Sequence, residues 1–319
     1  MKGICPITLT ESEIRDSHIF PKFMYEYLNA HGGNRNFIDF TNPKRISQNG
    51  TKIKMLGAET EESFSKSEKW FAEKIFVPYN THRLLNNEIE YGKELYYYIV
   101  SQLWRLLHYN EIISSRDNHP LFNPDYEELN ELCSKAKEEW RIFLNNGNMP
   151  QQFCNFYLMP LYSFLSIIPS RYFEIEFYIR RFFDSNIFCS ETGDRVMYCK
   201  LPNMIIWGLL SDCEPHWCYG RNINVDGGFL NMEFDQFDDE IMEYIFHRIG
   251  VCSQIMREDA HNFSEQHVKR LHEKMRKSPN LKNSELGEIL SLRKMPTVER
   301  PDEDTITELS QVNIHSSSD

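Results

Sequence analysis

Helical spacing of apolar residues dominates the middle of this chain. Leu95, Ile99 and Leu103 recur every four positions, which places them on one face of a helix. A second stretch with this spacing follows Asn123-Pro124, where Asn suits the N-cap and Pro the first helical turn. Gly147 is a suitable stop. The pattern therefore predicts two long helices, one after residue 91 and one ending near Gly147.

Short apolar runs separated by turn residues occupy the N-terminal region. The dipeptide Asn49-Gly50 is typical of a tight turn, and Lys52–Leu56 behind it predicts a strand. Helical spacing then covers residues 63–76, and Pro78 is expected to end that helix.

Residues 171–232 have the pattern of a mostly β region. The apolar run Asn203–Leu210 is typical of a buried strand, and residues 191–194 carry a turn signal. Helical spacing returns at residues 238–256 and 264–276.

These elements predict an α+β fold with three parts. A small hairpin and helix occupies residues 1–80, and residues 81–296 form a larger domain of helices packed on an antiparallel sheet. The polar, acidic residues 297–319 are expected to be a disordered tail.

Composition narrows the classes of partner. The 319 residues carry a formal charge of −12, so the surface as a whole does not attract nucleic acid, and a local basic patch or a partner must supply such a contact. No apolar stretch approaches the ~20 residues that span a bilayer, and the N-terminus has no apolar signal core. We therefore expect a cytoplasmic protein that does not enter a membrane, with mostly reduced cysteines.

Three local motifs are the sharpest signals in the chain. They are Ser17-His18-Ile19-Phe20-Pro21-Lys22-Phe23, then Met55-Leu56-Gly57-Ala58-Glu59-Thr60-Glu61 with Glu68 behind it, and finally Leu103-Trp104-Arg105. Together they resemble a bacterial family of HNH (His-Me finger) endonucleases with SHIIPKF, LLCxxCE and LWR segments. The resemblance covers roughly residues 4–108 and implies that residues 1–80 form a ββα-metal module.

The resemblance also implies a zinc knuckle that this chain has largely lost. The cysteine positions of the family correspond to Cys5, Thr8, Gly57 and Thr60, so one thiol of four remains. Because structural zinc requires four nitrogen or sulfur ligands, we expect no structural zinc here.

The catalytic residues implied by the resemblance are better kept. His18 is the candidate general base that activates water. Glu61, Glu68 and Ser17 stand at or near positions that hold a divalent cation, Mg²⁺ or Mn²⁺. Arg45, Lys52 and Lys54 are candidates for contacts with phosphate groups of a nucleic acid, with DNA favoured over RNA.

Plainer interpretations stand beside these. A lone histidine before an apolar pair is usually structural, and Glu61 and Glu68 fit a solvated acidic face at the start of a helix. Trp104 and Arg105 are expected to be a core aromatic and a buried ion-pair position.

Two further segments carry weaker signals. The loop Cys213-Glu-Pro-His216-Trp-Cys218 has metal-binding residue types at an unusual spacing, and the basic residues of 264–277 could face phosphate or simply water.

The sequence thus supports a leading hypothesis and two rivals. The first is a divalent-metal-dependent HNH nuclease subunit. By analogy with HNH modules it would act in bacterial defence against phage, with a partner such as an ATPase or a guide-bearing complex that delivers nucleic acid. The rivals are a catalytically inactive HNH-derived scaffold and a nuclease that is silent until a partner or signal arrives.

Overall fold

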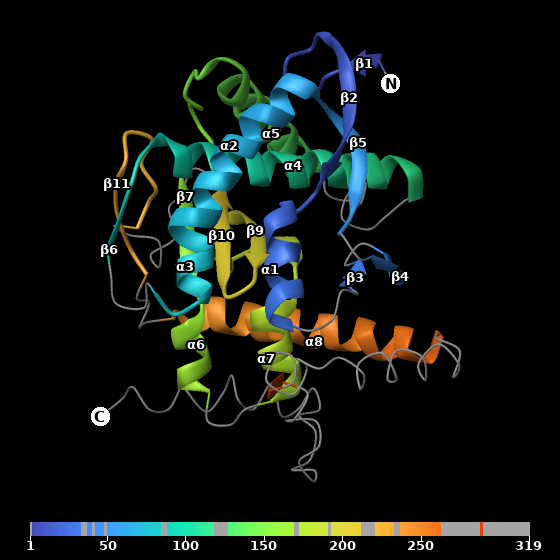
Figure 1. Cartoon of the computed structure of the whole chain (residues 1–319), viewed down its shortest axis with the longest axis vertical. Helices are drawn as coiled ribbons and strands as arrows, with labels where there is room; N and C mark the ends of the chain where they lie inside the picture. The colour runs from blue at the N-terminus through green and yellow to red at the C-terminus, as the bar shows by residue number, and fades with distance from the viewer. Residues whose placement is uncertain are drawn as a thin grey trace. The chain divides into compact units, whose positions relative to one another are not determined.

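The computed structural model describes residues 2–32, 37–39, 42–47, 50–83, 88–117, 127–168, 172–190, 193–211, 221–232, 237–262 and 288–289. The chain divides into two compact units, each built from several segments (Figure 1). Unit 1 contains Met1–Met24, Gly50–Pro160 and Phe183–Glu233, and unit 2 contains Tyr25–Asn49, Leu161–Phe182 and Phe234–Asp319. This division differs from the boundary predicted at residue 80, because the N-terminal hairpin and helix share a unit with the long helices that follow.

Unit 1 begins with a three-stranded antiparallel sheet. Its strands are β1 (Lys2–Ile4), β2 (Glu11–His18) and β5 (Lys52–Gly57), in the order β1-β2-β5. The helix α2 (Ala58–Phe71) follows β5 without a loop. The strand predicted at Lys52–Leu56 is thereby confirmed as β5. It pairs with β2 and leads directly into α2, while α1, β3 and β4 lie between β2 and β5 along the chain.

The prediction that Pro78 ends this helix was wrong. The chain continues from α2 through one π-helical turn, η1 (Ala72–Phe76), into the short helix α3 (Val77–Asn80). Pro78 lies in the first turn of α3, directly after the π-helical turn, and the backbone of Phe76 and Val77 before it is helical. The proline therefore does not interrupt the helical path.

The core of unit 1 is a four-stranded antiparallel sheet with two long helices. The strands lie in the order β7-β10-β9-β8. Their bounds are Phe156–Pro160 for β7, Asp184–Cys189 for β8, Arg195–Leu201 for β9 and Met204–Leu209 for β10. The helices are α4 (Lys93–Asp117) and α5 (Glu127–Asn146), and a separate ribbon pairs β6 (Glu88–Tyr91) with β11 (Gly228–Asn231).

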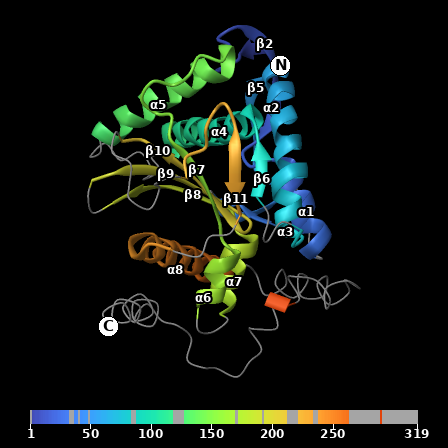
Figure 2. The same ribbon diagram turned by 90° about the vertical axis from the view of Figure 1, so that its left-hand side faces the viewer.

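Helix α4 is the central element of unit 1 and lies among α2, α5 and the four-stranded sheet (Figure 2). On one side Tyr98 stacks on Phe71 of α2 at 3.9 Å between ring centroids. On other sides Tyr96 contacts Phe143 of α5 and Phe156 of β7. The apolar face predicted from Leu95, Ile99 and Leu103 is confirmed, because all of these side chains are fully buried.

Unit 2 is smaller and mostly helical where it is described. It holds most of α1 (Lys22–Gly32), the pair β3 (Phe37–Asp39) and β4 (Asn42–Ser47), and the helices α6 (Tyr162–Ile167), α7 (Phe173–Arg181) and α8 (Asp239–Asn262). Helix α8 packs against both α7 and β4. Phe164 of α6 contacts Phe246 of α8 through their rings.

Helix α7 corrects the prediction that residues 171–232 are mostly β from their start. Alternating Phe173, Ile175 and Phe177 imitate a strand, but Ile175 and Ile179 are buried at helical spacing. Acidic residues in the first turn and Arg180 in the last turn also favour a helix through its dipole. The strand predicted at Asn203–Leu210 is confirmed as β10.

Several predictions lie outside the described residues. These are the helix start at Asn123-Pro124, the helix at residues 264–276 and the tail at residues 297–319. The α+β fold with antiparallel sheets is confirmed. Within the described ranges, none of the helices is both long enough and apolar enough to cross a bilayer.

Alanine substitutions at two glycines should change stability in opposite directions, one in each unit. A methyl group on Gly208 of β10 would lie 2.5 Å from Cδ1 of Leu103, whereas one on Gly250 of α8 would meet nothing within 4 Å. We expect Gly208→Ala to lower the free energy of unfolding by about 1–3 kcal/mol through overpacking. Gly250→Ala should raise it by about 0.5–1 kcal/mol through helix propensity. Urea denaturation measures both, and equal effects would contradict the packing of α4 on the sheet.

Candidate functional site

The hairpin of β2 and β5 contains a β-bulge that decides which side chains face inward. The register shifts between Arg15 and Asp16, just before the strand end. Beyond the bulge, Ser17 is 1% exposed, whereas Asp16 lies on the surface. The Ser17 hydroxyl accepts a hydrogen bond from the backbone N–H of Leu56 at 3.2 Å. The hydroxyl expected near a cation therefore has a structural partner inside the hairpin.

His18 is the last residue of β2 and is half-buried. Its Nε2 atom is shielded from solvent. Its partner across the ladder is Lys52, whose side chain is exposed. Because directly opposed residues of antiparallel strands point to the same face, the imidazole and the ammonium group share one face of the hairpin.

Glu61 lies in the first turn of α2, because the helix begins at Ala58. The residue is half-buried, its Oε1 atom is shielded from solvent, and no hydrogen-bond partner for that atom is found among the described residues. Glu68 stands two turns further along and shares its helical face. Of the expected cation ligands, Glu61 is therefore the one whose carboxylate has the fewest hydrogen bonds within the described part of the chain.

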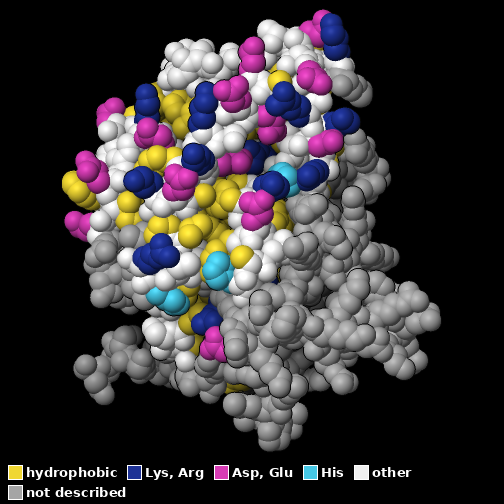
Figure 3. All heavy atoms as spheres, in the orientation of Figure 1, with side chains coloured by type: hydrophobic (Ala, Val, Ile, Leu, Met, Phe, Trp, Pro, Cys, Tyr) yellow, Lys and Arg dark blue, Asp and Glu magenta, His cyan; other side chains and the backbone are white. Residues whose placement is uncertain are grey.

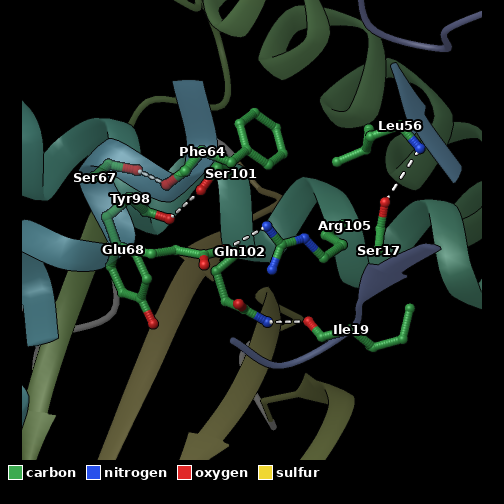
Figure 4. A network of polar contacts seen from close by, with 10 residues as sticks. All are labelled: Ser17, Ile19, Leu56, Phe64, Ser67, Glu68, Tyr98, Ser101, Gln102 and Arg105. Atoms are coloured by element: carbon green, nitrogen blue, oxygen red, sulfur yellow. Dashed lines mark hydrogen bonds and ion pairs between the residues drawn. The ribbon is translucent and has the colours of Figure 1, made fainter. Parts of the chain in front are cut away.

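Glu68 has a structural partner on another helix. Its Oε1 accepts a hydrogen bond from Nη2 of Arg105 at 2.7 Å, and the Arg105 side chain is 3% exposed (Figure 4). The guanidinium also lies over the ring of Phe64, 5.3 Å from its centroid. Trp104 is fully buried beside it. Both expectations for Trp104 and Arg105, a core aromatic and a buried ion pair, are confirmed.

The three candidate phosphate contacts belong to different units of the chain. Lys54 forms an exposed ion pair with Asp16 at 3.6 Å, and Lys52 lies beside His18 on the ladder. Arg45 belongs to β4 in unit 2, and its side chain is outside the described residues. On the face drawn in Figure 3, basic and acidic side chains are interspersed. On this face a phosphate group could contact individual basic side chains, but the face has no large basic patch.

The four positions at which the resemblance implied zinc-binding cysteines converge around one sulfur atom. Cys5 lies 3.3 Å from the hydroxyl of Thr60. The backbone N–H groups of Ile7, Thr8 and Gly57 donate to the same sulfur. Burial raises the pKa of the Cys5 thiol, but these hydrogen bonds outweigh it and leave the pKa below its ordinary value. The knuckle is thus kept as a hydrogen-bonded turn.

Leu9 completes this turn in a conformation that favours glycine. Its φ is +58°, its N–H donates to the carbonyl of Cys5 at 2.8 Å, and its side chain is exposed. The chain maintains this strained backbone because the sulfur and the carbonyl of Cys5 both require donors from the residues that follow.

These residues do not fit a structural zinc ion. Cys5 supplies one thiol where a tetrahedral site requires four nitrogen or sulfur ligands. A side chain at Gly57 would also approach the Ser12 hydroxyl to 2.6 Å. The position of the third cysteine is therefore occupied by a neighbouring side chain.

For Mg²⁺ or Mn²⁺ the fit rests on Glu61. No cluster of three or more His, Cys, Asp and Glu residues suited to a metal is found within the described ranges. A carboxylate oxygen that is shielded and lacks a hydrogen-bond partner in those ranges is nevertheless a suitable ligand for a hard cation.

Comparisons of the chain with protein-family models, curated proteins and solved structures gave no match. The likeness to HNH endonucleases therefore stays a prediction from the motifs. The Cys213–Cys218 loop and the basic residues of 264–277 lie outside the described residues.

The sulfur of Cys5 can be tested through stability. We expect Cys5→Ala to lower the free energy of unfolding by about 2–4 kcal/mol, because the Thr60 hydroxyl and the neighbouring backbone N–H groups lose the sulfur as a partner. Cys133→Ala is the matched control. That thiol is also buried, but no hydrogen bond to it is found in the described ranges, so its loss should cost about 1 kcal/mol. Equal losses in urea denaturation, or a loss of stability of the unmodified protein in EDTA, would contradict a metal-free knuckle.

The pairing of Glu68 with Arg105 predicts strong coupling between these residues. Glu68→Gln and Arg105→Met should each lower the free energy of unfolding by about 2–4 kcal/mol, because each leaves a mostly buried partner behind. The double variant should lose clearly less than the sum. Glu62→Gln is the control, since its pair with Lys66 is exposed and should contribute less than about 1 kcal/mol. Additive losses would show that the two groups stabilise the fold independently.

Proposed function

We propose that this protein is an HNH-type nuclease, or nuclease-like subunit, that hydrolyses phosphodiester bonds with the help of a divalent cation. The observation that carries the proposal is the β2-β5-α2 succession with the four knuckle positions gathered at Cys5 and His18 at the end of the first strand. This arrangement supports the proposal, because the positions matched on sequence alone lie together in the folded chain.

His18 is the proposed general base. Neutral imidazole takes a proton from water near pH 7, and the hydroxide so formed attacks phosphorus. The bond from phosphorus to the leaving sugar oxygen breaks, and that oxygen takes a proton from solvent water. Lys52, on the same face of the hairpin, is suited to hold a phosphate oxygen of the substrate. Glu61 would hold Mg²⁺ or Mn²⁺, with the remaining ligands from water and substrate phosphate, as is usual for Mg²⁺. Such a cation supplies charge stabilisation for the phosphoryl group.

The acidic chain implies that a partner brings the nucleic acid. At a net charge of −12 and with interspersed surface charges, long-range attraction to a polyanion is weak. We propose a protein partner, such as an ATPase or another subunit of a bacterial defence complex. DNA is favoured over RNA as the substrate, and a cytoplasmic location is part of the same proposal.

Cleavage assays with point variants test the proposal. The purified protein is incubated with supercoiled plasmid or single-stranded RNA and Mg²⁺ or Mn²⁺. We expect His18→Ala to reduce the cleavage rate by roughly 100-fold or more, as for loss of a general base. Glu61→Gln should reduce it and raise the cation concentration needed for half-maximal rate.

The neighbouring Glu62→Gln is the matched control. Glu62 is exposed and pairs with Lys66. The substitution removes the same charge as Glu61→Gln, from the same turn of α2. It should leave cleavage unchanged. Equal rates for the unmodified protein and His18→Ala would remove His18 from the reaction.

An inactive HNH-derived scaffold is the second candidate. It is favoured by two contacts, because the side chains of Ser17 and Glu68 are engaged by Leu56 and Arg105. In this second proposal the N-terminal module keeps the HNH fold but is catalytically inactive. Stoichiometric association with a partner protein, with no cleavage under either cation in the presence of that partner, would support it. Cleavage that begins only with the partner would instead support a nuclease that is silent when alone.

A further inference from the structure

Gln102 of α4 contacts the strand end that carries the candidate base. Its side chain is fully buried, and its Nε2 donates to the backbone carbonyl of Ile19 at 3.1 Å (Figure 4). The orientation of the amide follows from chemistry, because only its nitrogen can donate to a carbonyl. The contact joins residues 83 positions apart, so it is a tertiary contact and not a local turn.

The residue that follows His18 is thereby held at both of its backbone groups. The N–H of Ile19 donates to the carbonyl of Thr51 at 3.1 Å, while its carbonyl accepts from Gln102. The first bond orients the peptide plane between His18 and Ile19, on which the ψ angle of His18 depends, and the second holds Ile19 itself on α4. The preferred directions of the His18 imidazole depend on the backbone dihedrals of His18.

The same face of α4 also fixes α2. Tyr98, Gln102 and Arg105 follow one another at helical spacing. Tyr98 stacks on Phe71, and Arg105 binds Glu68. The three side chains therefore tie the strand end of His18 and the helix of Glu61 to one rigid element.

We propose that Gln102 is a positioning residue for His18, and that α4 is part of the site as its brace. The effect of Gln102 on the cleavage rate rests on the proposed function. Its structural content is independent of catalysis, since it states that the imidazole loses its fixed orientation when the Gln102 donor is removed.

Gln102→Met is the test variant, because methionine keeps the length and burial of the side chain and removes the N–H. Ser101→Ala is the matched control. Ser101 is the adjacent buried residue of α4, and its hydroxyl donates to the carbonyl of Tyr98 within the same helix. Both variants remove one side-chain donor from α4, but the Gln102 donor bonds the residue after β2, whereas the Ser101 donor bonds within α4. Circular dichroism and thermal melting establish that each variant is folded.

The first measurement is NMR of the full chain labelled with ¹³C at the histidine ring, with His18→Gln used to assign the signal of His18. We expect the His18 signal to shift or broaden in Gln102→Met and to stay in place in Ser101→Ala. An unchanged His18 signal in a folded Gln102→Met variant overturns the proposal, whether or not the protein cleaves nucleic acid. A change of equal size in Ser101→Ala overturns it too, since the effect would then be a general loosening of α4.

The second measurement is the cleavage rate. Where the unmodified protein cleaves, Gln102→Met should lower kcat by roughly 10- to 100-fold with KM within about twofold, as for misplacement of a catalytic group. A change in KM alone would assign Gln102 to substrate binding and overturn positioning. No cleavage by the unmodified protein would count against the proposed function and leave the NMR result to decide on Gln102.

Discussion

The burial of polar groups on α4 is the constraint on which unit 1 depends. Arg105 and Gln102 lie in the interior, where an unpaired guanidinium or amide would cost several kcal/mol. Their partners are Glu68 of α2 and the carbonyl of Ile19 behind β2. The N-terminal hairpin and its helix therefore cannot move away from α4 without leaving a charge in an apolar core. This requirement makes the hairpin-helix part of a larger core and not a separate module joined by a linker.

The same constraint explains how the hairpin-helix stays folded with one cysteine. A structural zinc ion contributes roughly 10–16 kcal/mol to the folding of a small knuckle, whereas a hydrogen bond contributes about 1 kcal/mol. The donors around the Cys5 sulfur cannot replace the metal in full. Packing supplies the difference: Arg141 of α5 donates to the carbonyl of Ile7 at 2.9 Å, and Phe71 of α2 stacks on Tyr98 of α4. The turn at Cys5 is therefore stabilised by the packing of its neighbours.

The sequence predicted the parts that follow from periodicity and short motifs. The buried face of α4, the strand β5 and the convergence of Cys5 with Thr60 were all accessible from spacing or from resemblance. Helix α7 was not, because its alternating aromatics satisfy strand spacing as well as helical spacing, and tertiary packing decided between them. The partner of Glu68 was also hidden, because no local pattern shows which carboxylate a buried arginine 37 residues away will select. Gln102 carried no signal at all, since a polar residue within an apolar helix gives no indication of the carbonyl it will reach.

The discontinuity of the two units has a consequence for how the protein is made. Unit 1 draws on three stretches of chain, the last of which ends at Glu233. A ribosome releases the hairpin strands first, α4 later and β8 to β10 later still, at about 5–20 residues per second. Until those strands emerge, the nascent chain therefore carries a helix α4 whose apolar residues are not yet covered by the four-stranded sheet. Such a chain is a natural client for chaperones that shield apolar surface during translation, and slow codons before residue 233 would lengthen its exposure.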